Sequence, residues 1–391
     1  MHQNKEVMIV AENEVEQLHS AHTGVLSIHP ELTVRNREDL GKAYTPGVAG
    51  LAKEIEADPA KKDVYTTSGK LVAVVTDGSA VLGLGNIGPA GGLPIVEGKA
   101  LLYKELAGVD AIPLAVEQVS IDDFVATIKN IAKSFAGIHL EDIAAPRCFA
   151  IEDALQKELN IPVYHDDQEG SAIVVLAGLI NAAKVVGKSV TDLKVVLTGV
   201  GASGIATAKL LLAAGIKHIS LVDIHGVVKP DDIRYNSYQR ELAGQVDSAA
   251  GETLDDVIKG ADAFVGLSDA HVLTGAQVKE MADQPIIFAL ANPVPEIDPA
   301  EAQAAGAAVI ATGASKYPNQ VNNILAFPGL FRGLLKSGLK SVNVALETKI
   351  AQALAGLIAT PTAEKIVPGV FDDGVVDAVT AGVEEFAKAQ K

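Results

Sequence analysis

The sequence predicts an α/β protein in two parts: an N-terminal α/β domain, then a Rossmann-type domain with a doubly wound parallel sheet and C-terminal helices. Short apolar runs rich in β-branched residues alternate with Ala- and Leu-rich stretches of helical length. This alternation is typical of parallel sheets covered on both faces. A glycine fingerprint directly follows one of these runs, and a chain of 391 residues is long enough for two to three domains.

The same pattern places the individual elements. A helix predicted over residues 171–186 ends at Gly187, before a new strand. We therefore expect an N-terminal domain of residues 1–165 and a second domain of residues 166–391. Residues 324–391 are predicted to be mostly helical, apart from a stretch rich in Pro, Thr and Gly at 360–374. The predicted strands are residues 71–76, 194–198, 219–222 and 286–290, and another helix is predicted over residues 205–214.

Charge and cysteine content exclude several classes of protein. The chain has 32 Lys and Arg against 49 Asp and Glu, a net charge of −17, and no clustered basic run. Such a chain repels phosphodiester backbones, so we expect no nucleic-acid partner. Cys148 is the single cysteine, which rules out an intramolecular disulfide and a thiolate metal cluster.

The sequence shows neither a targeting signal nor a membrane span. Residues 1–10 include Lys5 and Glu6 and lack an apolar signal core. An apolar run at residues 172–180 stops at Asn181, well short of the roughly 20 residues that a membrane-spanning helix needs. We therefore expect a cytoplasmic protein without a membrane partner.

One of two G-x-G-x-x-G motifs lies in the context of a dinucleotide site. Its glycines, Gly199, Gly201 and Gly204, follow the strand at 194–198 and open the helix at 205–214, and Ala202 and Ser203 lie between them. That arrangement aims free backbone N–H groups and the positive end of a helix at a pyrophosphate. The alternative is a glycine-rich turn that binds nothing.

Asp223 predicts the choice of dinucleotide. It lies nineteen residues after Gly204, at the end of the next predicted strand. A carboxylate at this place accepts hydrogen bonds from the adenine ribose and repels a 2′-phosphate, which favours NAD over NADP. Two basic residues, His225 and Lys229, follow closely and weaken that preference.

The other glycine motif lacks this context. It comprises Gly83, Gly85 and Gly88, and Pro89 and Pro94 come directly after it. We expect these prolines to prevent a helix from starting at Gly88. The segment is then either a flexible lid or wall of a pocket, or a plain loop.

Four carboxylates form a candidate metal site. Glu141 and Asp142 are adjacent, as are Asp166 and Asp167. A ligand set made of carboxylates alone favours Mg²⁺ or Mn²⁺ over zinc. Two structural explanations compete: the first pair can be a solvated loop, and Asp167 can cap a helix that begins near Ser171.

Lys99 and Tyr44 are candidate proton-transfer groups. On a helix over residues 94–107, Lys99 shares an apolar stripe with its neighbours at helical spacing. Burial there would lower its pKa toward neutrality and make it a possible general base, whereas a lysine that reaches out to water would keep its usual pKa. Tyr44 precedes a Thr-Pro-Gly turn that can present its phenol to a cleft, or it simply packs.

Taken together, these segments resemble the malic enzyme family in its short bacterial form. They occur in the family's order from about residue 20 to the C-terminus, and the segment around Asp166 and Asp167 is the most specific. Besides the fingerprint at Gly199, the matching segments are residues 44–49, 76–88, 97–100, 139–143, 164–172 and 292–296.

The resemblance implies roles for particular residues. The metal ligands would be Glu141, Asp142 and Asp167. Lys99 would be the general base with Asp166 as its ionic partner, and Tyr44 the general acid. Asn292 and Asn323 would hold the substrate near the nicotinamide. The family's arginine for a substrate carboxylate has no clear counterpart here, and the candidates are Arg35, Arg37, Arg147 and Arg332.

The implied activity is oxidative decarboxylation of L-malate to pyruvate and CO₂, through oxaloacetate, with NAD and Mn²⁺ or Mg²⁺. The N-terminal domain would hold substrate and metal, and the chain would form a homodimer with its N-terminal helices or Tyr44 near the interface. A phosphotransacetylase-like extension is not expected within 391 residues. The alternatives are a metal-dependent oxaloacetate decarboxylase with little redox activity and a protein that only senses the dinucleotide.

Overall fold

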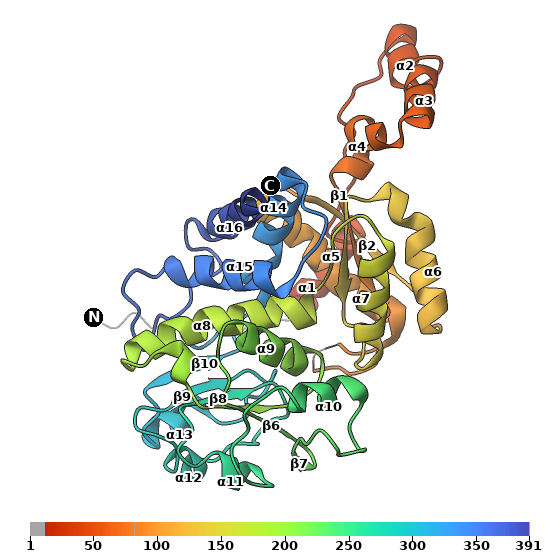
Figure 1. The fold of residues 1–391 in the computed structure, drawn as a ribbon. Helices are drawn as coiled ribbons and strands as arrows, with labels where there is room; N and C mark the ends of the chain where they lie inside the picture. The colour runs from red at the N-terminus through yellow and green to blue at the C-terminus, as the bar shows by residue number, and fades with distance from the viewer. Residues whose placement is uncertain (1–11, 82, 391) are drawn as a thin grey trace, which may run out of the picture.

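The computed structural model describes residues 12–81 and 83–390 (Figure 1). The stretch 1–10, in which no signal sequence was found, lies outside the described residues. Within them, no helix combines the length and the apolar character that crossing a bilayer requires. The cytoplasmic location stays a prediction.

The first sheet has four parallel strands in the order β2-β1-β3-β4. Its register pairs Thr76 with Glu141 and Leu140 with His165, so the carboxyl ends of β1, β3 and β4 lie side by side. The strands are β1 (Leu71–Thr76), β2 (Asp110–Ala115), β3 (Gly137–Glu141) and β4 (Val163–His165), and the accompanying helices are α5 (Gly88–Ala107), α6 (Ile121–Ile131) and α7 (Arg147–Glu158).

The start of α5 differs from the prediction. We expected Pro89 and Pro94 to prevent a helix from beginning at Gly88, but α5 begins there. Pro89 lies in the first turn, where its missing N–H would have no helical partner in any case. Pro94 is tolerated inside the helix at the loss of one hydrogen bond. The helix therefore runs without interruption from the glycine loop through Lys99.

The second sheet has six strands in the order β10-β9-β8-β5-β6-β7, all parallel except β7. β5 lies between β6 and β8, so the chain winds in both directions from it, which is the switch point where doubly wound sheets bind ligands. The strands are β5 (Val195–Thr198), β6 (Ile219–Asp223), β7 (Gly226–Val227), β8 (Ala263–Gly266), β9 (Ile286–Ala289) and β10 (Val309–Thr312). The strands predicted at 71–76, 194–198, 219–222 and 286–290 are confirmed.

Helices cover this sheet and continue beyond it. The helices predicted at 171–186 and 205–214 are confirmed by α8 and α9. The helices of this part are α8 (Ser171–Val185), α9 (Ala202–Ala213), α10 (Ser237–Ala243), α11 (Leu254–Val257), α12 (Gly275–Val278) and α13 (Pro299–Ala304). The predicted helical C-terminus is also confirmed, by α14 (Phe327–Ser337), α15 (Val344–Gly356) and α16 (Val375–Ala389).

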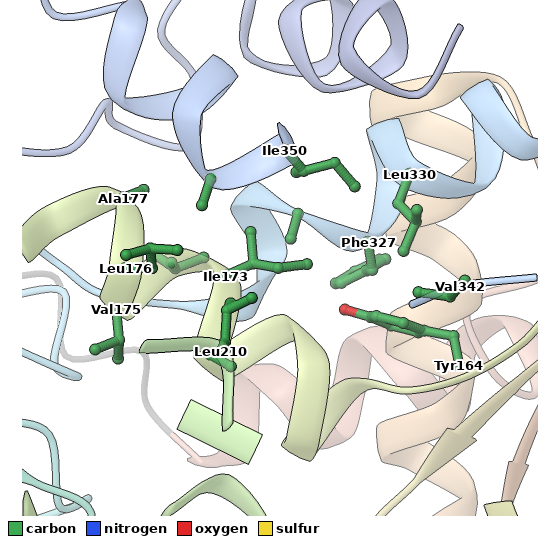
Figure 2. Packing of buried hydrophobic residues seen from close by; sticks show 14 of the residues in the cluster. Tyr164, Ile173, Val175, Leu176, Ala177, Leu210, Phe327, Leu330, Val342 and Ile350 are labelled. Atoms are coloured by element: carbon green, nitrogen blue, oxygen red, sulfur yellow. The ribbon is translucent and has the colours of Figure 1, made fainter. Parts of the chain in front are cut away.

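The C-terminal helices join the two parts of the molecule. α14 packs on α5 of the first part, while α15 packs on α8 of the second. Phe327 of α14 contacts the Tyr103 ring of α5 at a centroid distance of 4.9 Å. Figure 2 shows Ile173 of α8, Phe327 and Tyr164 gathered in the resulting core. The domain boundary between residues 165 and 166 stays a prediction.

Three short helices near the N-terminus project from the body of the molecule (Figure 1). They are α2 (Arg37–Ala43), α3 (Val48–Ala57) and α4 (Lys62–Tyr65), and none of them contains a buried residue. We call residues 37–65 the arm. A further helix, α1 (Glu12–His22), precedes it.

Candidate functional site

Lys99 lies at the centre of the candidate active site. Its side chain is only 14% exposed, and its ammonium group is hydrogen-bonded to Asp166 Oδ2. The same Nζ lies 3.2 Å from Glu141 Oε1 and 3.3 Å from Asn323 Oδ1. The structure thus joins three predicted site residues to Lys99, although they come from segments far apart in the sequence.

The first sheet brings these carboxylates together. Glu141 is the last residue of β3, and Asp166 and Asp167 directly follow β4, its parallel neighbour. Asp142 adopts a left-handed backbone with φ of +56°, a conformation that costs free energy but that Asp adopts more readily than most residues. Asp167 lies in a short π-helical turn, Asp166–Gly170, between β4 and α8.

Glu141, Asp142 and Asp167 fit a divalent cation. Each offers a carboxylate oxygen, and these oxygens lie within 4.8 Å of one another. Within residues 12–81 and 83–390, Asp142 Oδ2 is buried without a hydrogen-bond partner, and a cation would satisfy this atom. Neither competing explanation is supported: Glu141 and Asp142 are 3% and 4% exposed, so they are not a solvated loop, and Gly170 rather than Asp167 caps α8.

Repulsion among the carboxylates perturbs their protonation. Burial and the neighbouring Glu141 raise the pKa of Asp142 to about 7, and the same two causes raise the pKa of Asp167 well above its usual range. Burial would raise the pKa of Glu141 as well, but the Lys99 charge and a hydrogen bond from His139 lower it to about 2. Carboxylic acids held together in this way lose their protons when a cation binds.

The structure confirms Asp166 as the ionic partner of Lys99, but both sequence-based expectations for the surroundings of Lys99 were wrong. Its side chain does not reach out to water, and its pKa is not lowered. Burial alone would lower the pKa, but the charges of Asp166, Glu141 and Asp167 outweigh that effect and raise the pKa above the ordinary value. The ammonium also lies 4.8 Å from the centroid of the Phe327 ring, which adds a cation–π contact.

Sequence reasoning missed three residues that contact this cluster. His139 Nε2 lies 2.6 Å from Glu141 Oε2, and Tyr103 OH lies 2.8 Å from His139 Nδ1. The Tyr164 hydroxyl donates to Asp166 Oδ1 at 2.6 Å. Spacing could have revealed all three, because strand residues two apart and helix residues four apart share a face. His139 and Tyr164 each lie two residues before a site carboxylate, and Tyr103 lies four residues after Lys99.

A second buried layer holds the turn that carries Asp166 and Asp167. Gln168 Nε2 donates to Glu152 Oε2 at 2.6 Å, and the backbone N–H of His165 donates to Glu169 Oε2 at 2.7 Å. Burial raises the pKa of Glu152 to about 8. The two hydrogen bonds hold the turn from behind.

A cavity of about 800 Å³ lies at the carboxyl edge of the second sheet, where doubly wound sheets bind ligands. Gly199, Gly201 and Asp223 line it. A Cβ on Gly199 would lie 2.3 Å from the Leu267 carbonyl oxygen, and one on Gly204 would lie 1.8 Å from the Gly199 carbonyl oxygen. A Cβ on Gly201 would meet nothing within 4 Å, so this glycine leaves the backbone open to a pyrophosphate.

The two basic residues near Asp223 have other partners. Lys229 forms an ion pair with Glu252. The His225 ring packs edge-on against Tyr235 at a centroid distance of 5.9 Å. Asp223 Oδ1 accepts a hydrogen bond from the Ile224 N–H at 2.9 Å, which holds the carboxylate at the edge of the cavity.

Ser203 connects the glycine fingerprint to the carboxylate cluster. We predicted it as a cofactor-binding residue, and it lies in the first turn of α9, next to Ala202. Its hydroxyl donates to the backbone carbonyl of Asp167 at 2.7 Å. The candidate dinucleotide and metal sites are therefore joined by one direct hydrogen bond.

The first glycine motif faces the second part of the chain. Gly83, Gly85 and Gly88 all have positive φ. A Cβ on Gly83 would lie 3.4 Å from Pro293 Cδ and 3.5 Å from the Asn292 carbonyl oxygen. The motif thus forms a wall against the exposed turn that carries Asn292, rather than a second dinucleotide fingerprint. Among the residues that the structure describes, Asn292 makes no hydrogen bond to Lys99 or its partners.

Tyr44 lies away from the Lys99 cluster. It caps α2 in the arm and is 66% exposed. The four candidate arginines do not contact the cluster either, as far as the described residues show. Arg37 is the first residue of the arm and Arg35 lies two residues before it. Arg147 lies 3.2 Å from Asp77 Oδ2, and Arg332 bonds Thr380 and Asp377.

Comparisons with known proteins match both parts of the chain. The malic enzyme N-terminal domain matches residues 25–120 and 115–156, and the malic enzyme NAD-binding domain matches residues 168–376. The chain is similar to an NAD-dependent malic enzyme of Geobacillus stearothermophilus, with 48% identity over 93% of this chain and 77% of that protein. It shares 47% identity with a bifunctional malic/malolactic enzyme of Bacillus subtilis, over 95% of this chain and 91% of that one.

A solved structure agrees with these matches. The crystal structure of an NAD-dependent malic enzyme from Thermotoga maritima superposes with a TM-score of 0.91 at 42% identity, covering 94% of this chain and 98% of that one. Relatives at 44% identity include NADP-dependent malic enzymes. The sequence matches and the shared fold both cover nearly the whole chain, so the chain belongs to the malic enzyme family.

Proposed function

We propose that this protein is an NAD-dependent malic enzyme that converts L-malate to pyruvate and CO₂. The observation that carries the proposal is that Lys99 is ion-paired beside three carboxylates that fit a metal. Ser203 connects this cluster to the part of the chain that forms the dinucleotide cavity. In this proposal residues 1–165 supply the base and two metal ligands, and residues 166–391 supply Asp167 and the NAD site.

Two bound groups supply chemistry that side chains lack. A divalent Mn²⁺ or Mg²⁺ held by Glu141, Asp142 and Asp167 supplies a Lewis acid for the substrate oxygens and for the negative charge left by the departing CO₂. NAD, held at Gly199, Gly201, Ala202, Gly204 and Asp223, supplies the hydride acceptor.

Lys99 is the proposed general base for the C2 hydroxyl of malate. In the ion-paired cluster it holds its proton tightly, because Asp166 and Glu141 stabilise the ammonium form. A cation held by Glu141 and Asp167 would draw on their negative charge, so these carboxylates would stabilise the ammonium form less and Lys99 would give up its proton more readily. Asp166, kept in place by Tyr164, then holds the amine in position.

Asn323, Asn292 and Tyr44 complete the proposed machinery. Asn323 reaches Lys99 directly, and its amide can orient the substrate hydroxyl next to the base. Asn292, in the turn after β9, would hold the substrate carboxylate near the nicotinamide. Tyr44 would donate the proton to C3 that releases pyruvate.

Replacing Lys99 tests the proposed base. In K99A, malate oxidation should fall by about 10²- to 10⁴-fold, because the general base is lost. NADH binding, followed by fluorescence, should persist, because the fingerprint loop is untouched. The matched control is K104A on the same helix, whose lysine pairs with Asp110 at the surface. Turnover retained in K99A would contradict the role.

Asp223 tests cofactor choice. D223S should shift the ratio of kcat/KM for NAD to kcat/KM for NADP toward NADP, because the carboxylate no longer repels a 2′-phosphate. The matched control is D255S, which changes another carboxylate lining the same cavity. An unchanged ratio in D223S, or an equal shift in D255S, would show that a different residue sets the preference.

We further propose that the chain is a homodimer built through the arm. Isolated helices as short as α2 and α3 are marginal in water unless an apolar face packs on something, yet neither contains a buried residue. Leu40, Tyr44 and Tyr65 are all more than 40% exposed. A second copy packed on this face would cover them, and it could bring Tyr44 of one copy to the Lys99 cluster of the other.

Mixing two inactive variants tests this shared site. Y44F and K99A should each lose activity, but subunit exchange should restore it, because a mixed dimer contains one site with both intact residues. With random exchange about one quarter of all sites would be complete. Tagged copies and analytical ultracentrifugation check the exchange. Mixed dimers without recovered activity, or a monomeric wild type, would contradict the shared site.

A further inference from the structure

The Glu141 carboxylate is held on both sides. One oxygen, Oε1, lies 3.2 Å from Lys99 Nζ, and the other, Oε2, lies 2.6 Å from His139 Nε2. Glu141 and His139 are both buried, and His139 is 0% exposed. The His139 contact is therefore a hydrogen bond within the protein interior, shielded from competing water.

Tyr103 determines which ring nitrogen of His139 carries the proton. The Tyr103 hydroxyl is fully buried, and within the described part of the chain its recorded partner is His139 Nδ1, at 2.8 Å. A buried phenol donates its single O–H, so Nδ1 accepts. The neutral ring then carries its proton on Nε2, where it points at Glu141.

Aromatic packing fixes the plane of the imidazole. Phe327 lies edge-on to His139 at a centroid distance of 5.6 Å, and Tyr164 lies at the same distance on another side. Phe331 packs on the ring at 6.3 Å. The ring can rotate only if these neighbours move, and close-packed interiors resist such motion.

The other histidine at the same spacing does not play this part. His165 precedes Asp167 by two residues, as His139 precedes Glu141. Its Nε2, however, lies 3.8 Å from Asp167 Oδ2, too far for a hydrogen bond, and neither ring nitrogen has a partner among the described residues. Of the two pairs, only His139 and Glu141 are joined.

We infer that His139, oriented by Tyr103, is a positioning residue that fixes Glu141 for binding of a divalent cation. The inference rests on the proposed metal site. A hydrogen bond from outside the ligand set orients a metal-binding carboxylate before the ion arrives, and loss of such a bond typically weakens metal affinity by about 10- to 100-fold.

The test is titration of metal-stripped, full-length protein with Mn²⁺, followed by the electron paramagnetic resonance signal of the free ion. H139M and H139Q have side chains of similar size, but only the glutamine can donate a hydrogen bond from the place of Nε2. We expect H139M to bind Mn²⁺ about 10- to 100-fold more weakly than wild type, and H139Q to recover most of that loss. A purely structural role for His139 would affect both variants alike.

Removal of single hydroxyl groups provides a second comparison that perturbs packing little. Y103F should weaken Mn²⁺ binding severalfold, because the ring proton is no longer confined to Nε2. Y164F removes a matched hydroxyl from the same aromatic cluster, and this hydroxyl bonds Asp166, which is not a proposed ligand. Y164F should leave Mn²⁺ affinity near that of wild type. Folding of H139M is judged by NADH fluorescence. If H139M does not fold, the comparison of Y103F with Y164F decides whether His139 positions Glu141.

The outcomes distinguish a failure of the positioning role of His139 from a failure of the proposed metal site. If wild type does not bind Mn²⁺, the proposed metal site is wrong. If wild type binds and folded H139M and Y103F bind with the same affinity, the metal site stands and the positioning role is overturned. Equal losses in H139M and H139Q would also overturn it.

Discussion

The proposed site depends on how one largely buried lysine, Lys99, is balanced against four clustered carboxylates, of which Asp167 alone is partly exposed. Among the described residues, Lys99 is the only lysine or arginine that forms an ion pair with Glu141, Asp142, Asp166 or Asp167. Breaking a buried ion pair of this kind typically costs about 3–5 kcal/mol. Burial and the charge of Glu141 raise the pKa values of Asp142 and Asp167. One ammonium group cannot neutralise four carboxylates, which is why the cluster favours a divalent cation.

The fold brings these charges together through the ends of neighbouring elements. β3 and β4 end side by side and present Glu141 and Asp166, while α5 supplies Lys99 from the helix that follows β1. The turn after β4 also touches the first turn of α9, where Ser203 donates to the Asp167 carbonyl. The backbone that carries a proposed metal ligand is thus held by the helix that faces the dinucleotide cavity. This contact joins the two proposed sites mechanically.

Much of this arrangement could be predicted from the sequence, because its signals are local. Continuous apolar runs indicated four of the strands, and the position of Asp223 at the end of β6 followed from its spacing after Gly204. The start of α5 could not be predicted by treating every proline as a helix breaker, since Pro89 lies in the first turn. The direction of the Lys99 pKa shift depends on Asp166, which is 67 residues away and becomes a neighbour only through the fold. His139 and Tyr103 could have been identified from the sequence by the same periodicity arguments that indicated Lys99.

The most direct test of the proposed chemistry is a paired spectrophotometric assay on metal-stripped protein before and after Mn²⁺ is restored. One sample contains L-malate with NAD⁺ or NADP⁺ and is followed by formation of the reduced nicotinamide. The other contains oxaloacetate alone and is followed by loss of the ketone. The ion-paired site beside a complete dinucleotide cavity predicts NADH only when malate, NAD⁺ and Mn²⁺ are all present. Loss of oxaloacetate while malate stays inert would contradict this and assign the protein to the decarboxylating lyases.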